Sequence, residues 1–205
     1  MNVRKRFAVY SMTATVIGGL MLGVAAPAQA ASAATPKCAG RTATIVGTNA
    51  AEDLAGTTGN DVIVALGGDD YIEGRGGNDI ICGGAGSDLI GGQAGNDNVY
   101  GESGKDQLVG GSGNDYVSGG AGADEILGST GNDTLYGNAG DDFITAAAGK
   151  DWASGGSGSD IIAGGAGNDT LYGNTGADAI AGMGGKDKLY GGTGRNKLFQ
   201  GNFPS

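Results

Sequence analysis

Aspartate is the residue whose spacing in this sequence points most directly to chemistry. It recurs every nine residues, without an insertion, and Asn196 takes the sixteenth position. The set is Asp61, Asp70, Asp79, Asp88, Asp97, Asp106, Asp115, Asp124, Asp133, Asp142, Asp151, Asp160, Asp169, Asp178 and Asp187. Carboxylate oxygens are ligands for hard cations such as Ca²⁺, so a carboxylate repeated at a fixed period suggests repeated cation binding.

The composition excludes several other kinds of chemistry. Histidine is absent, which removes His-based catalytic triads, His–Cys dyads and nearly every His-ligated zinc site. The chain has 22 acidic and 12 basic residues, and its net charge of −10 argues against nucleic acid or an anionic membrane surface as the partner. Its 46 glycines would be typical of disorder if they did not follow a regular period.

The elements that must position the aspartates follow from the same nine-residue unit, in which we place aspartate at position six. Residues 83–91, GGAGSDLIG, show the whole unit. Its last three residues fit a short strand, and the preceding six fit a Gly-rich turn. Two strands and two turns make a coil of eighteen residues, so sixteen units predict an all-β fold, a right-handed parallel β-roll of about eight coils.

An aliphatic residue at position eight supplies the core of this coil. Strand alternation places it inside and its two neighbours outside. The expected core residues are Ile63, Ile72, Ile81, Ile90, Val99, Leu108, Val117, Ile126, Leu135, Ile144, Ala153, Ile162, Leu171, Ile180, Leu189 and Leu198. Only Ala153 is small, and it belongs to the most irregular unit, which also contains Trp152 and the run at 146–148. Such a thin core is insufficient alone, because ordering a Gly-rich chain costs more entropy than these side chains recover.

The repeated unit resembles the RTX, or haemolysin-type, calcium-binding nonapeptide GGxGxDxUx. The resemblance covers residues 56–199, which hold sixteen consecutive units in register. It implies a parallel β-roll with calcium ions between same-side turns of neighbouring coils. The implied ligands are the aspartate carboxylates and backbone carbonyls of the preceding turns. Examples of these carbonyls are those of Gly83, Ala85, Gly110, Ser112, Gly164 and Ala166.

Stacking the coils places the aspartates in two rows. The first row runs from Asp61 to Asp187 and the second from Asp70 to Asn196, in steps of eighteen residues. Neighbouring carboxylates then lie about 5 Å apart and repel by ~3 kcal/mol at an effective dielectric of 20. An Asx-turn, in which aspartate caps its own backbone, explains a lone aspartate but not a column that glutamate never enters.

Calcium between the carboxylates accounts for both rows. Seven intervals in the first row and six in the second join two aspartates, which makes up to about thirteen inter-turn sites. All-oxygen coordination of flexible geometry suits Ca²⁺ better than Mg²⁺, and zinc lacks suitable ligands. We therefore expect Ca²⁺ as the cofactor.

The first thirty residues predict a signal peptide. A basic head at residues 4–6 precedes an uncharged stretch over 7–26 and an A-x-A exit at 28–30. The exit favours cleavage over the alternative, a membrane anchor. Removal leaves 9 basic and 22 acidic residues, a charge of −13, and no membrane span in the mature chain. We therefore expect a secreted, extracellular protein.

Export also bears on the two cysteines. An even pair in an exported chain predicts a disulfide between Cys38 and Cys82. Residues 31–55 are interpreted as an N-terminal cap with two degenerate repeats, and residues 200–205 as a C-terminal tail.

Together these features predict a secreted calcium-binding β-roll that folds in response to calcium and has a structural or extracellular-matrix role. Catalysis is not expected, because residues 31–55 are too few for a catalytic domain and histidine is missing. The open ends of the coil make end-to-end self-association a further expectation.

The alternative is an adhesin-like surface for a glycan or for ice on the same roll. An asparagine ladder at position five and a tyrosine column at position nine are its candidates. The tyrosines are Tyr100, Tyr136, Tyr172 and Tyr190. Ladder hydrogen bonding and strand propensity explain the same patterns more simply.

Overall fold

A computed structural model describes residues 35–202 of the chain. The signal peptide predicted over residues 1–30 lies outside these residues. Strands and turns make up the described part, which contains no helix. Accordingly, no helix of this part is long and apolar enough to cross a membrane.

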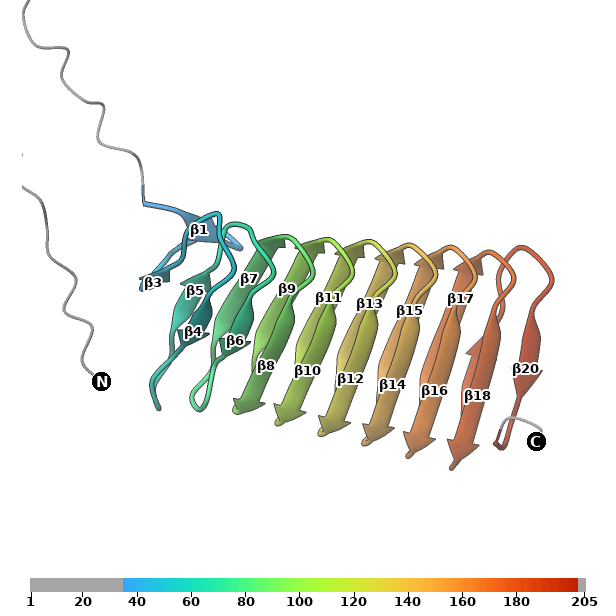
Figure 1. The fold of residues 1–205 in the computed structure, drawn as a ribbon. Coiled ribbons are helices and arrows are strands. Elements are labelled where there is room, and N and C mark those ends of the chain that lie inside the picture. The colour runs from blue at the N-terminus through green and yellow to red at the C-terminus, as the bar shows by residue number, and fades with distance from the viewer. Residues whose placement is uncertain (1–34, 203–205) are drawn as a thin grey trace, which may run out of the picture. The chain divides into compact units, whose positions relative to one another are not determined.

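Two parallel sheets of nine strands each form the fold (Figure 1). The odd sheet contains β3 (Ile45–Val46), β5 (Val62–Val64), β7 (Ile80–Ala85), β9 (Asn98–Ser103), β11 (Tyr116–Ala121), β13 (Thr134–Ala139), β15 (Trp152–Ser157), β17 (Thr170–Thr175) and β19 (Lys188–Tyr190). The even sheet contains β4 (Asp53–Ala55), β6 (Tyr71–Glu73), β8 (Leu89–Ala94), β10 (Gln107–Ser112), β12 (Glu125–Thr130), β14 (Phe143–Ala148), β16 (Ile161–Ala166), β18 (Ala179–Gly184) and β20 (Lys197–Phe199). Because the chain alternates between the sheets, each pair of strands is one coil, and the predicted parallel β-roll is confirmed.

The roll has about nine coils, one more than the sixteen regular units supply. The additional coil comes from the degenerate repeats ahead of the array. Ile45 of β3 is in register with Ile63 of β5, and Leu54 of β4 is in register with Ile72 of β6. An aliphatic residue in the right register is therefore enough to add a coil.

From β7 to β18 the strands are six residues long, where the sequence suggested three. Each continues into the first three positions of the next unit, which leaves a turn of three residues such as 86–88. The amide of Ala85 donates to the carbonyl of Leu66 (3.1 Å), and the amide of Gly68 donates to the carbonyl of Ala85 (2.8 Å). Stacked turns thus bond to one another through their backbones, and much of each predicted turn joins the sheet.

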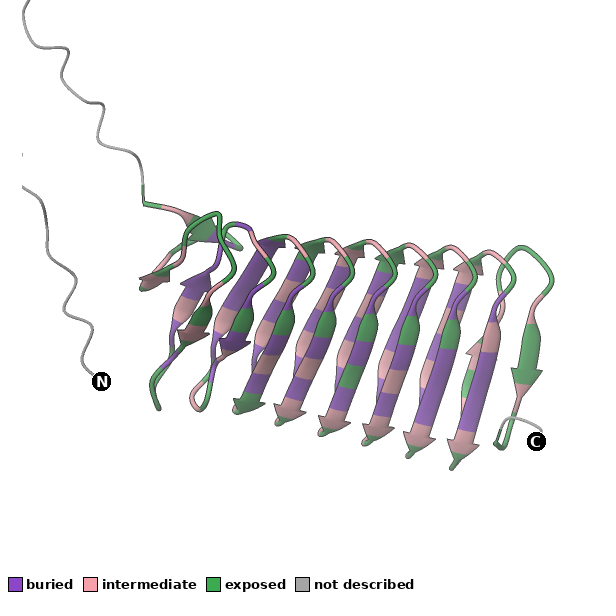
Figure 2. Cartoon of the chain, viewed as in Figure 1, coloured by how far each residue is buried: buried purple, intermediate pink, exposed green. Residues whose placement is uncertain are grey.

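The aliphatic column fills the space between the two sheets. From Ile63 to Ile180 every expected core residue is 0–1% exposed. Figure 2 shows the buried residues as bands that recur along the strands. Leu189 is only partly buried, and Leu198 is 46% exposed and was wrongly predicted as core, because β20 is the last strand of its sheet.

The predicted disulfide is present. Cys38 and Cys82 are joined by an S–S bond of 2.01 Å with their Cα atoms 5.8 Å apart. Cys38 lies in a small antiparallel hairpin, β1 (Lys37–Cys38) and β2 (Arg41–Thr42). Both cysteines are buried with Val64 in a second apolar cluster. The bond therefore fastens the N-terminal hairpin to the outer face of the odd sheet, over β5 and β7.

Candidate metal centres

The fifteen aspartates lie in the turns where the chain passes from one sheet to the other. They form the two predicted rows, in which Asp97, for example, stacks on Asp115. Fourteen of the aspartates, from Asp61 to Asp178, are only 0–8% exposed, and Asp187 is half-buried. Carboxyl groups are rarely this buried unless they are paired, so the partners of their oxygens decide what the turns can do.

In every aspartate after the first of its row, one carboxylate oxygen accepts a hydrogen bond from the neighbouring coil. The backbone amide of Asp97 donates to Oδ1 of Asp115 at 2.9 Å. The same bond joins all thirteen pairs of successive aspartates, at 2.8–3.0 Å. Asn196 continues the second row, since its Oδ1 accepts from the amide of Asp178 at 2.9 Å.

Asp61 is capped within its own turn, although by a residue four positions earlier and not by an Asx-turn. Its Oδ2 accepts hydrogen bonds from the amide and the hydroxyl of Thr57, within the same turn, at 2.7 and 2.9 Å. No other aspartate of the two rows shows such a cap among the described residues.

The second oxygen of the other fourteen aspartates has no hydrogen-bond partner within the described chain. These are the buried Oδ2 atoms of Asp70, Asp79, Asp88, Asp97, Asp106, Asp115, Asp124, Asp133, Asp142, Asp151, Asp160, Asp169, Asp178 and Asp187. A buried polar atom without a partner is costly, and native proteins contain few of them. Two unbroken rows of such atoms therefore indicate that a cation or a proton belongs there.

At nine of these fourteen aspartates, a backbone carbonyl of the next coil lies near the unpartnered oxygen. A Cβ built on Gly92, at position one, would lie 2.5 Å from Asp97 Oδ2 and 2.7 Å from the carbonyl oxygen of Gly110. The equivalent distances at Gly164 are 2.6 Å and 2.8 Å. We call this space over the first glycine of a unit the glycine cradle. Its carboxylate and carbonyl oxygens, from successive coils, are the donor types that Ca²⁺ takes.

The two kinds of carbonyl predicted as ligands are placed differently. The carbonyl at position one, represented by Gly110, borders a glycine cradle. The carbonyls of Ala85, Ser112 and Ala166, at position three, accept backbone amides of the preceding coil at 2.8–2.9 Å. A carbonyl oxygen has two lone pairs, so these groups retain acceptor capacity, but their first partner is the sheet.

The repeats match a known family throughout the roll. Eight overlapping stretches, each of four copies, match the RTX calcium-binding nonapeptide repeat and together span residues 46–198. The chain belongs to this RTX repeat family. No match was found among curated proteins. The family implies calcium binding, and the buried, repeating aspartates of this chain fit that ion.

Backbone groups must complete each RTX site. Within residues 35–202 there is no group of three or more Cys, Asp or Glu side chains placed to hold a metal ion. Each interval offers at most two carboxylates, so a cation there needs carbonyl oxygens as well. This agrees with a ligand set of carboxylates and turn carbonyls.

Burial raises the pKa of twelve of the RTX aspartates, because desolvation disfavours the charged carboxylate. The bond from the preceding backbone amide opposes this effect, and in most of them neighbouring carboxylates add to it. The pKa is raised to about 6 at Asp79, Asp97, Asp106, Asp133, Asp160 and Asp169, and to about 7 at Asp142. Around neutral pH these groups therefore gain from a positive charge beside them.

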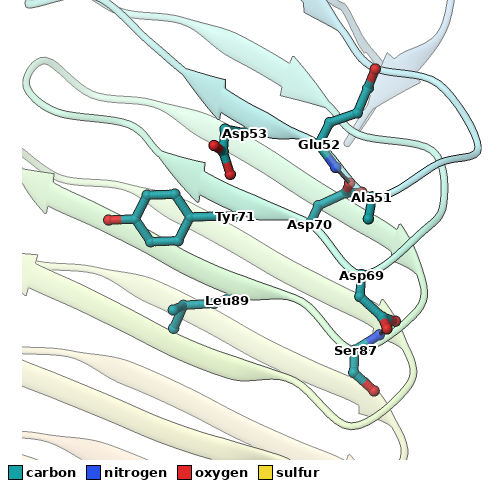
Figure 3. A pocket seen from close by; sticks show the side chains of 8 residues that line it. All are labelled: Ala51, Glu52, Asp53, Asp69, Asp70, Tyr71, Ser87 and Leu89. Carbon is teal, nitrogen blue, oxygen red and sulfur yellow. Dashed lines mark hydrogen bonds between the residues drawn. The ribbon is translucent and has the colours of Figure 1, made fainter.

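The second row begins at a surface pocket of about 410 Å³ (Figure 3). Its lining residues are Ala51, Glu52, Asp53, Asp69, Asp70, Tyr71, Ser87 and Leu89. The amide of Glu52 donates to Asp70 Oδ1 (2.8 Å), so Glu52 occupies the aspartate position of the first coil. Its own carboxylate accepts from Thr48 (2.7 Å), and Asp69 accepts from Ser87 (2.8 Å). Glu52 and Asp69 are therefore already bonded to backbone amides, and the pocket lies at the end of the row.

The asparagine ladder is explained by backbone bonding. The amide of Asn78 donates to Oδ1 of Asn60, and the same bond recurs from coil to coil at 2.6–2.8 Å. The simpler of the two explanations given by the sequence therefore accounts for these side chains.

The tyrosine column is part of a longer aromatic ladder on the outer face of the odd sheet. Its rings, in order, are Tyr100, Tyr116, Tyr136, Trp152, Tyr172 and Tyr190, with centroids 4.6–5.5 Å apart. Sequence reasoning missed Tyr116 and Trp152, because they stand at position seven and the tyrosines at position nine. Both positions point to one face of a strand, and this two-residue period was the signal that could have found them.

Proposed function

We propose that this chain is a secreted structural protein whose RTX roll folds when it binds calcium outside the cell, and that it has no catalytic activity. The observation that carries the proposal is the set of fourteen buried Oδ2 atoms without partners. Next-coil carbonyl oxygens lie near nine of them, and the carboxylates themselves make the turns rich in negative charge. Calcium would neutralise that charge at the point where the coils meet.

Folding and calcium binding are coupled in this proposal. A site made of residues eighteen apart in sequence exists only when the coils are stacked, so the free energy of binding adds to the free energy of folding. The affinity expected for extracellular calcium modules is a Kd of ~10⁻⁴–10⁻³ M. The chain would then stay largely unfolded at low cytosolic calcium and fold after export.

Circular dichroism of the mature chain tests this coupling. We expect little strand signal in EGTA at pH 7.5 and a cooperative gain of strand signal on adding millimolar Ca²⁺. Magnesium at the same concentration is the matched control and should be much less effective. A strand signal that EGTA leaves unchanged would contradict the proposal.

Secretion is supported by the signal-like first thirty residues and by the disulfide, which is typical of oxidising compartments. Expression of the full sequence in a bacterial host with a tagged C-terminus tests it. We expect the tagged protein in the periplasm or medium, shortened by cleavage after Ala30. Retention of the full-length chain in the cytosol would count against export.

Ligand binding on the outer surface is the second candidate function, and the aromatic ladder is the observation that favours it. Six contacting rings form a continuous strip, and Tyr190 at one end is 47% exposed. Aromatic side chains on a flat sheet are suited to sugars or other extended ligands. Glycan-array and ice-recrystallisation assays on the calcium-loaded protein test this function, and binding that persists after Trp152→Ala would exclude the ladder.

A further inference from the structure

One unit of the roll, residues 146–154, departs from the others at two buried positions. Ala146 stands at position one in place of glycine, and Ala153 stands at position eight in place of a larger aliphatic residue. Both are 0% exposed and belong to the main core cluster. The backbone of β14 keeps its register with β12 and β16, and Ala147 has the same φ of 82° as Ser129 in the preceding coil. Only the side chains of this unit therefore differ.

The two positions touch each other across the inside of the coil. In a regular unit, a Cβ built on Gly83 would lie 3.0 Å from Cδ1 of Ile90. The corresponding distance between Gly164 and Leu171 is 3.2 Å. A methyl group at position one thus competes with the end of the side chain at position eight. The alanine pair resolves this competition, because a carbon is gained at one position and removed at the other.

Trp152 does not fill the space that a small residue leaves at position 153. Its ring lies in the aromatic ladder, between Tyr136 (4.8 Å) and Tyr172 (5.5 Å). The contacts between positions one and eight in regular units place the methyl group of Ala146 beside Ala153.

The same methyl group stands in a glycine cradle. In the preceding coil, a Cβ on Gly128 would lie 2.5 Å from Asp133 Oδ2 and 2.7 Å from the carbonyl oxygen of residue 146. By the equivalence of the coils, the real Cβ of Ala146 lies between Asp151 Oδ2 and the carbonyl of Gly164. A methyl group is no ligand, and it takes the space between two oxygens that a cation would bridge.

We propose that Ala146 and Ala153 form an apolar plug that closes the calcium site between Asp151 and the coil of Asp169. The inference rests on the proposed calcium binding and concerns which intervals of the rows are used. The cradle at Gly128 keeps its carbonyl, so the closure is confined to one interval. The plug divides the first row into a segment before it and a shorter one after it.

Ala65 makes the same change at position one in the first regular turn of the second row. It is 0% exposed, and its unit has Ile72 at position eight, so the methyl group is accommodated there without a small core residue. We extend the proposal to this cradle, that of Asp70, where closure shortens the row instead of dividing it.

Two double variants test the plug: one removes it, and the other creates a plug in a regular unit. The double variant Ala146→Gly/Ala153→Ile restores a regular unit, and Gly164→Ala/Leu171→Ala converts the next unit of the row into a plug. Bound calcium per chain is measured by equilibrium dialysis at saturating Ca²⁺, with circular dichroism as the check on folding. We expect one ion more than the parent in the first variant and one ion fewer in the second.

Two single substitutions complete the test. Ala65→Gly should also add one ion, and Ala148→Gly removes a methyl group at an exposed position of the same irregular unit and should leave the number unchanged. Unchanged numbers in both opened variants, in a parent that binds calcium, would overturn the inference and leave the proposed function standing. A parent that binds no calcium would overturn both.

Discussion

Two buried regions lie close together inside this roll, the aliphatic column and the aspartate rows. They differ in whether the protein alone satisfies the contacts of their side chains. The aliphatic column is closed: its members from Ile63 to Ile180 are 0–1% exposed and stack on their equivalents one coil away. The aspartates from Asp61 to Asp178 are only 0–8% exposed, yet fourteen Oδ2 atoms of the two rows lack a partner in the described chain. Contacts within the protein satisfy the aliphatic column, whereas the aspartate rows need a cation or a proton from the solution.

This contrast explains how a chain with so thin a core can fold, and why its folding depends on the solution. Side-chain packing sets the register of the coils, because identical positions meet in every pair of neighbours. The free energy of the stack is then decided in the turns, where burial disfavours the charged carboxylates. The aliphatic column thus sets the structure, and the aspartate rows set the solution conditions in which that structure is stable.

Acidification of the calcium-free chain should give the largest effect among the tests of this contrast, since twelve carboxyl groups with raised pKa act together. A folded-state pKa near 6 above an unfolded value of 3.8 means that the fold binds protons more tightly. Stability without calcium is therefore highest below pH 4 and falls as the pH rises to about 6, or 7 for Asp142. In EGTA, strand signal should return between pH 7 and 4.

The calcium-loaded chain should show the opposite slope over the same window. Protons and Ca²⁺ compete for the same carboxylates, so the midpoint calcium concentration should rise as the pH falls below about 6. Thermal melts at fixed calcium and varied pH measure this. If the two slopes had the same sign, the aspartate rows would not be the calcium ligands.

Substitution in the closed region should act independently of calcium. Ile126 is 1% exposed and packs between Leu108 and Ile144. Ile126→Ala should cost about 2–5 kcal/mol of unfolding free energy through lost burial and a cavity. Urea titrations in Ca²⁺ at pH 7.5 and in EGTA at pH 4.5 should give similar losses, and a loss confined to calcium would mean that core and turns are not separable.

Substitution in the open region should change sign with the solution. Asp115→Asn keeps the Oδ1 acceptor for the amide of Asp97, as Asn196 shows in the second row. It removes a buried carboxylate, so in EGTA the variant should fold at a higher pH than the parent. In calcium it loses a ligand, and we expect a loss of about 1–3 kcal/mol, seen as a higher midpoint calcium concentration.

Asp61→Asn is the matched control, because Asp61 already has two donors from Thr57 on its Oδ2. The asparagine amide can turn its oxygen toward Thr57 and keep both bonds, because the other oxygen of Asp61 contacts only the Thr44 hydroxyl, at 3.4 Å, so stability should change little with or without calcium. Equal behaviour of the two variants would remove the distinction between the capped turn and the open rows.

The fold and the rows could be predicted from the sequence because they depend on which residue type recurs at which position. The period of nine places Ile81 on Ile63 and Asp115 on Asp97 before any coordinates are known. The pairing of Cys38 with Cys82 needed only an even count and the expectation of export. None of these predictions required knowledge of which atoms touch.

The remaining features depend on contacts between positions, and a pattern read one column at a time misses them. The six-residue strands arise from backbone bonds between stacked turns, which glycine-rich sequence does not distinguish from an open turn. The aromatic ladder combines two positions of alternate coils, such as Tyr136 and Trp152. The alanine plug depends on position one meeting position eight inside the coil, which the sequence order does not show.

A substitution in the aromatic ladder should give the smallest and most local effect, because the ladder lies on the outer face of the sheet and its ring contacts do not involve calcium. Tyr136 contacts Tyr116 at 5.5 Å and Trp152 at 4.8 Å, centroid to centroid. Tyr136→Leu keeps an apolar side chain and removes both ring contacts, each worth about 0.5–1.5 kcal/mol beyond the area buried. The loss should be equal in calcium and in acid EGTA, and Trp152 fluorescence should shift in both. Phe143→Leu, an exposed ring of the even sheet outside the ladder, should change neither. A calcium-dependent loss at Tyr136 would show that the open turns, and not the sheet, hold the ladder in register.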